Sequence, residues 1–220
     1  MGIGRRKFVK MASLSLAGLG VNPVKASFIN ENMYVNSKLG IMFEKPDGWT
    51  IIKKQDFGEM FDKQILDDGW ENFKNELKED LDEPICVIAK YYAEDDRYNE
   101  QFSPSIVVEV TAKSDFNFLE GASFNKVAEI SHQFTESFLK DFKVLKEYPP
   151  YSIDGVNFLE YDAQYLFEHI DLKEPILTEL KVIKAETENY FYDFNMHQSK
   201  AKNEIADIEF TKFKNSLKFL

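Results

Sequence analysis

Residues 156–167 have the sequence VNFLEYDAQYLF, and this stretch constrains the fold more strongly than any other. Apolar and polar side chains alternate through its centre: Leu159, Tyr161, Ala163, Tyr165 and Phe167 lie on one side, and Glu160, Asp162 and Gln164 on the other. A period of two is typical of a β-strand with one buried face. The chain must therefore build a sheet and cover at least one side of it.

Further segments with strand patterns flank this one. They are 39–46 and 49–54, joined by the turn Pro46-Asp47-Gly48; 84–92 and 104–113; and 175–185 and 188–197, joined across Glu186-Thr187. A turn at Asp154-Gly155 precedes the alternating stretch. Strands joined by such short turns pair with their sequence neighbours, which favours an antiparallel sheet.

Helical periodicity is found in three places. Residues 55–82 predict one or two surface helices, 123–142 predict a long amphipathic helix that Ser123 caps, and 199–218 predict a closing helix. Together with the strands they predict an α+β fold, a central antiparallel β-sheet flanked by helices as an α/β/α sandwich.

The first 26 residues have the three parts of an export signal. A basic head is followed by the apolar stretch 11–21, and small residues lead to a predicted cut between Ala26 and Ser27. The head, GRRKFVK, resembles the twin-arginine signature at Arg5, Arg6, Phe8 and Lys10. An ordinary secretory signal is the alternative. We expect a signal peptide at 1–26, a short lead-in at 27–37 and a single domain at 38–220, in a periplasmic or secreted protein that meets the export machinery through its leader.

The charge balance narrows the range of partners. The chain has 27 Lys and Arg against 38 Asp and Glu, and five of the basic residues lie in the leader, so the mature net charge is −16. Such a surface repels phosphate backbones, so we expect no nucleic-acid partner. No stretch beyond residue 26 is long and apolar enough to span a bilayer, so we expect a soluble mature chain without an integral membrane segment.

Candidate chemistry is sparse. Cys86 lies in an apolar run, where a buried inert thiol is expected. His132 and Glu136 stand four apart on one helix but lack a third ligand, so a polar contact is the better interpretation. His169 and His197 are scattered, and the acidic clusters at 67–69, 79–84 and 94–97 do not follow a calcium-loop pattern. We therefore expect no catalytic residue, no metal and no cofactor.

The segment LGIMFEKPDGWTI (39–51) resembles the entry of the PsbP/Mog1-like family: an apolar strand, a Pro-x-Gly-Trp turn and a second strand. The central helix at 123–142, the turn Ile153-Asp154-Gly155 and the closing FTKFKNSLKFL have counterparts in that family in the same order. The resemblance implies a six- or seven-stranded antiparallel sheet between helices. It also implies action by binding, since the photosynthetic members of the family dock on a membrane complex.

Three functions follow as hypotheses. The first is an exported envelope protein that binds a protein partner, with Phe116, Phe118 and Leu119 as a possible contact surface. The second is a periplasmic protein that binds a small molecule or lipid among its aromatic strands. The third is a hydrolase with a dispersed site, which would need a cleft with convergent ionisable groups.

Overall fold

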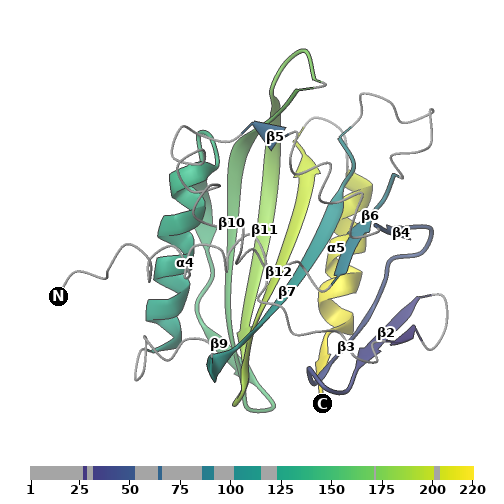
Figure 1. The fold of residues 1–220 in the computed structure, drawn as a ribbon, viewed down its shortest axis with the longest axis vertical. Coiled ribbons are helices and arrows are strands. Elements are labelled where there is room, and N and C mark those ends of the chain that lie inside the picture. The colour runs from purple at the N-terminus through teal and green to yellow at the C-terminus, as the bar shows by residue number, and fades with distance from the viewer. Residues whose placement is uncertain are drawn as a thin grey trace.

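The computed structural model describes residues 27–28, 32–52, 64–65, 86–91, 102–114, 123–170, 172–200 and 204–220. Within these ranges an antiparallel sheet dominates, with helix α4 (Phe124–Phe138) on one side and helix α5 (Glu204–Ser216) on the other (Figure 1).

The main sheet contains nine of the described strands. Its central path runs β4 (Thr50–Ile51), β6 (Cys86–Ala89), β7 (Ser105–Ala112), β12 (Tyr190–Ser199), β11 (Ile176–Glu186), β10 (Val156–His169) and β5 (Gln64–Ile65), while β8 (Lys143–Glu147) and β9 (Tyr151–Ile153) also pair with β10. Every pairing in it is antiparallel. The alternating segment at 156–167 thus lies in the longest described strand, as its pattern predicts.

Two turns that the sequence predicts are present with the backbone they require. Asp154 and Gly155 join β9 to β10 with φ of 51° and 83°, the left-handed pair of a two-residue hairpin. Gly48 has a φ of 77° just before Trp49, where a side chain on Cβ would strain the backbone.

A smaller sheet joins both ends of the described chain. It has the order β1 (Ser27–Phe28), β2 (Met33–Asn36), β3 (Ile41–Glu44) and β13 (Lys218–Phe219). Phe219 pairs with Ile41, so the end of the chain closes against the strand that precedes the Pro-Asp-Gly-Trp turn. β1 and β2 lie in the segment expected as a lead-in.

The larger hydrophobic core lies between the main sheet and α5. The ring of Phe210 meets the edge of Trp49 at 5.9 Å, and Phe213 meets Phe43 at 5.2 Å and Phe194 at 6.0 Å. All five side chains are buried. Trp49 is therefore a core residue, and removing a ring such as Phe210 would cost about 3–5 kcal/mol of stability.

Helix α4 lies on the opposite face. Phe124 stacks on Phe191 at 5.9 Å. Phe191 is three residues before Phe194 on β12, so the two side chains point to opposite faces of the sheet, and Phe194 is the one that faces α5. The Ser123 side chain accepts a hydrogen bond from the backbone N–H of Lys126, as a cap should. The helix ends at Phe138, four residues before the predicted end, because Leu139 is already extended.

The prediction of an α/β/α sandwich is wrong. Strands make up 52% of the described residues and helices 20%, and α4 and α5 are the only two helices among them. One helix on each face is not a helical layer. The polar edge strands β8 and β9 are sheet. Of the segment 55–82, expected to be helical, only Gln64–Ile65 are described, and they form strand β5 on the edge of β10; the rest of that segment lies outside the described residues.

Neither α4 nor α5, the helices in the described part of the chain, has the length and apolarity needed to cross a membrane.

Candidate functional site

The predicted export residues cannot be located in the structure. Arg5, Arg6, Phe8, Lys10 and Ala26 lie outside the described residues, and so do Phe116, Phe118 and Leu119 of the expected contact surface. Ser27 is described and begins β1, where it pairs with Val35.

His132 packs as an aromatic side chain. Its ring stacks on Tyr161 at 5.5 Å and meets the edge of Phe142 at 5.5 Å, whereas Glu136 is exposed. Among the described residues no group of three His, Cys, Asp or Glu side chains could hold a metal ion.

Of the other singled-out groups, Cys86 is buried, and His169 and His197 are partly buried. His197 Nδ1 lies 3.0 Å from the hydroxyl of Tyr165, and burial lowers the pKa of His197 to about 4. Burial also raises the pKa of the Cys86 thiol to about 12, a little offset by Lys45. An imidazole with so low a pKa is a weak base, and a thiol that keeps its proton is a poor nucleophile at neutral pH.

A cluster of buried polar side chains lies beneath α4, and no sequence pattern predicts it. Lys184 of β11 donates to Asp193, which lies directly opposite it on β12, and to the Ser131 hydroxyl of α4 at 2.8 Å. Asn195 donates to Glu109 of β7 at 3.3 Å. Glu109 and Lys184 are 1% and 6% exposed, so these charged groups lie in the interior.

The Ser131–Lys184 contact has the geometry of a serine–lysine dyad, but its electrostatics oppose that chemistry. A lysine acts as a base only when its pKa is lowered. Burial alone lowers the pKa of Lys184, yet Asp193, Tyr161 and Glu109 outweigh burial and raise it above its ordinary value of 10.5. The ammonium therefore keeps its proton, and the cluster acts as a buried ion pair that fixes α4 to the sheet.

A groove of about 480 Å³ opens where α4 begins, between the first residues of the helix and the sheet. Its lining includes Phe124, Asn125, Tyr151, Ser152, Asn157 and Glu186. Three strands, β9, β10 and β11, and the start of α4 contribute to the lining, and none of these side chains is a candidate site residue in the sequence.

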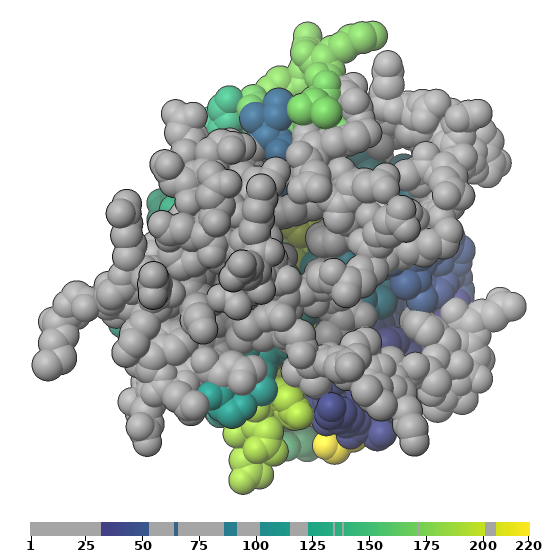
Figure 2. Space-filling view, in the orientation of Figure 1, coloured from purple at the N-terminus to yellow at the C-terminus, as the bar shows by residue number. Residues whose placement is uncertain are grey.

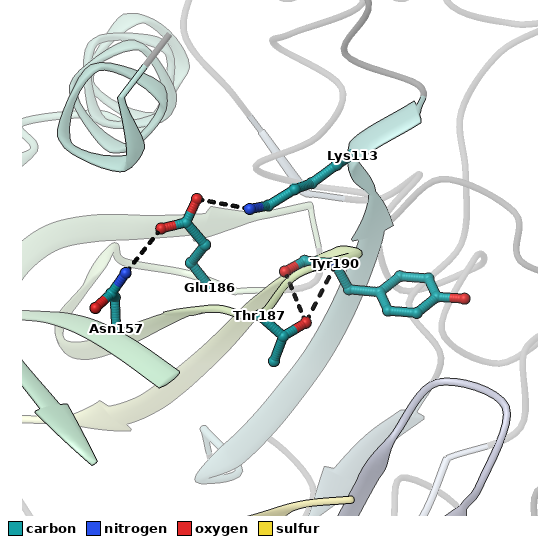
Figure 3. Close-up of polar contacts among 5 residues, drawn as sticks. All are labelled: Lys113, Asn157, Glu186, Thr187 and Tyr190. Carbon is teal, nitrogen blue, oxygen red and sulfur yellow. Dashed lines mark hydrogen bonds and ion pairs between the residues drawn. The ribbon is translucent and has the colours of Figure 1, made fainter. Parts of the chain in front are cut away.

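The polar side chains of the groove are held by one another. The Glu186 carboxylate lies between the Lys113 ammonium at 2.8 Å and the Asn157 amide at 3.1 Å (Figure 3). The Ser152 hydroxyl lies 3.2 Å from Asn157 Oδ1. Nearby, the Thr187 hydroxyl closes the β11–β12 turn: it donates to the carbonyl of Tyr190 at 3.4 Å and accepts from the N–H of Tyr190 at 3.3 Å (Figure 3).

The opposite end of the sheet carries exposed aliphatic side chains. Ile170 is 63% exposed, Ile65 46% and Leu177 37%. Ile65 pairs with Glu168, and Leu177 pairs with Leu166. Because residues 166 and 168 are two apart on β10, Ile65 and Leu177 project from the same face.

We call Ile65, Ile170 and Leu177 the aliphatic tip. β5 (blue) and the β10–β11 connection (green) lie together at the top of Figure 2. A sequence signal for it exists in EHIDLKEPIL (168–177), where apolar residues interrupt a polar turn. Ile65 lies far from Ile170 and Leu177 in the sequence, so no local pattern shows that it belongs to the tip.

No family model matches the sequence, and no curated protein does. Among solved structures, the chain is similar to PA94 of Pseudomonas aeruginosa, a protein of unknown function, with 15% identity and a TM-score of 0.42 over 57% of this chain and 76% of that one. It is also similar to the cyanobacterial PsbP (CyanoP) of Synechocystis sp. PCC 6803, with 12% identity and a TM-score of 0.39 over 90% of this chain and all of that one.

Proposed function

We propose that this chain is an exported envelope protein of the PsbP/Mog1-like type that acts by binding a protein partner, and that the aliphatic tip is its contact surface. The twin-arginine-like leader motivates the export, and the Pro-Asp-Gly-Trp turn with its following landmarks motivates the family. The observation that carries the proposal is the grouping of three exposed aliphatic side chains at one end of the main sheet.

Exposed aliphatic side chains stabilise a complex when a partner removes them from water. Scattered single apolar residues on a surface need no explanation, but exposed apolar side chains gathered at one end of a sheet are a mark of an interaction surface. The end of β10 beside the tip is held by Lys140, just after α4: its ammonium pairs with Glu168 at 2.8 Å and its carbonyl accepts from the N–H of Leu166. A preorganised surface loses little conformational entropy on binding.

Catalysis is not proposed, because the one serine–lysine contact in the described residues has a protonated lysine. The groove supports a second candidate, the binding of a small molecule, since it combines aromatic lining with a few fixed polar groups. The two surfaces lie at opposite ends of α4, so one protein could carry both.

Substitution of the tip tests the proposal. The tagged full chain is expressed in a bacterium that exports it, the periplasmic extract is passed over an affinity resin, and retained proteins are identified by mass spectrometry. We expect Ile170→Lys to lose the partner. The matched control is Ile208→Lys, an isoleucine of similar exposure (59%) that lies on α5 and is not part of the tip. Equal capture by the two variants would contradict the proposal.

A further inference from the structure

We propose that the groove at the start of α4 binds an uncharged polyhydroxylated ligand, a short saccharide. This inference deepens the small-molecule candidate of the proposed function and does not depend on the aliphatic tip. It rests on three properties of the groove: its charge, its spare hydrogen-bonding capacity and its aromatic lining.

The charges near the groove come in neutralised pairs. Glu186 is paired with Lys113 at 2.8 Å, and Glu160, which accepts from the Tyr151 hydroxyl, is paired with Lys214 of α5 at 2.6 Å. Neither carboxylate is left to attract a cation, and neither ammonium is left for an anion. A groove of this kind selects against strongly charged ligands, because a charged ligand would lose its hydration without gaining a counter-ion.

The polar side chains retain donors and acceptors after satisfying one another. Asn157 uses one amide hydrogen on Glu186 and one Oδ1 position for Ser152, so one hydrogen and one lone pair remain. Each Glu186 oxygen has a further acceptor site. A sugar hydroxyl is both donor and acceptor, and two neighbouring hydroxyls match the planar amide of Asn157 beside the planar carboxylate of Glu186.

The apolar part of the lining suits the other surface of a sugar ring. Phe124 and Tyr151 line the groove and are only partly buried, and each is supported from behind by a stacked ring, Phe191 at 5.9 Å and Phe158 at 4.9 Å. The C–H groups of a pyranose pack on aromatic side chains while its hydroxyls reach the polar rim. The volume of about 480 Å³ lies within the range of sites for small ligands.

An extended peptide is the main competing ligand. A peptide that adds to a sheet needs a free run of backbone N–H and C=O groups at an edge. At the groove the nearest edge strand is β9, which is three residues long and follows Pro150, a residue without an N–H. The edge therefore offers little backbone for a peptide to pair with.

The test uses the purified chain labelled with ¹⁵N and three probes: chitotriose, cellotriose and a mixture of uncharged tripeptides. We expect at least one trisaccharide at millimolar concentration to shift the amide signals of Asn125, Ser152 and Asn157 in a saturable way. Asn157→Leu should weaken that binding about tenfold, because it removes the amide but keeps the size of the side chain. Gln133→Leu, an exposed amide on α4 beyond the groove lining, is the matched control and should bind as the unaltered chain does.

Saturable shifts by the tripeptides without shifts by either saccharide would overturn the inference, and so would the absence of any shift at the groove. An equal loss in the Asn157→Leu and Gln133→Leu variants would also overturn it. Failure here leaves partner capture through Ile170 unaffected, so the two proposals can fail separately.

Discussion

Lys184 and Asp193 lie directly opposite each other on β11 and β12, and their side chains form an ion pair in the interior beneath α4. The same ammonium also donates to Ser131, so a single lysine joins two strands to a helix. A buried charge with two partners stabilises the arrangement chiefly because removing one partner leaves the other charge uncompensated.

Replacing Lys184 by Met should therefore destabilise the fold by about 3–5 kcal/mol, since Asp193 keeps its charge without its counter-ion. Urea unfolding at neutral pH measures the change. The double variant Lys184→Met with Asp193→Leu is the control and should recover much of the loss, because no unpaired charge remains. A single variant within about 1 kcal/mol of the unaltered chain would show that the pair contributes little.

Glu109 gives the fold a stability that falls as the pH rises. Burial raises its pKa well above 4.5, Asp193 raises it further, and Lys184 opposes both. The folded state therefore holds a proton that the unfolded state releases near pH 4.5, so this contribution is complete below pH 4.5 and is lost as the pH rises through the folded pKa. Urea unfolding across pH 4–8 should show that Glu109→Gln gains stability relative to the unaltered chain towards the alkaline end. A constant difference at every pH would contradict this assignment.

His197 has the opposite effect. Its pKa falls from 6.5 to about 4 in the folded state because burial disfavours the charged imidazolium. The unfolded chain takes up the proton first, so stability is fully present above pH 6.5 and is lost towards pH 4, by up to about 1.4 kcal/mol for each pH unit. His197→Gln should lose that slope, and the ring signals of His197 in a ¹H–¹³C NMR titration should move near pH 4. Titration of the ring near pH 6.5 would be incompatible with its burial beside Tyr165.

The turn before Trp49 depends on Gly48. With a φ of 77° and no atom within 4 Å of an added Cβ, an alanine would be strained by its backbone and not by a clash. Gly48→Ala should cost about 1 kcal/mol in thermal or urea unfolding, and Gly48→Asn should cost less, because asparagine tolerates the left-handed region. An asparagine variant less stable than the alanine variant would point to a steric cause instead.

The strands were the most predictable part of the fold, and the reason is visible in β10. Its side chains alternate between a face towards α5 and a face towards α4, so the period of two survives in the sequence. The paired turns were predictable as well, because Gly48 and Gly155 have backbone angles that few other residues accept. The amount of helix on each face was not predictable, since amphipathic periodicity alone does not say how much of a sheet a helix covers. This is why the predicted α/β/α sandwich was wrong.

The buried polar side chains beneath α4 could not be predicted from the sequence either. On β12, Asp193 and Asn195 alternate with Tyr192, Phe194 and Met196, a pattern that ordinarily predicts polar side chains in water. They are instead turned towards α4, where Lys184 and Glu109 meet them from the neighbouring strands. That meeting depends on the strand register, which pairs residues 184 and 193, and on the order β7–β12–β11. Local sequence patterns contain neither the register nor the strand order.

Photo-cross-linking in living cells tests the proposed binding function most directly. A benzoylphenylalanine at position 170 of the exported full chain should give, on irradiation, a discrete cross-linked product with an envelope protein, while the same residue at position 208 should give none. Products of equal yield from the two positions, or no product from position 170 in cells that contain the folded chain, would contradict the account.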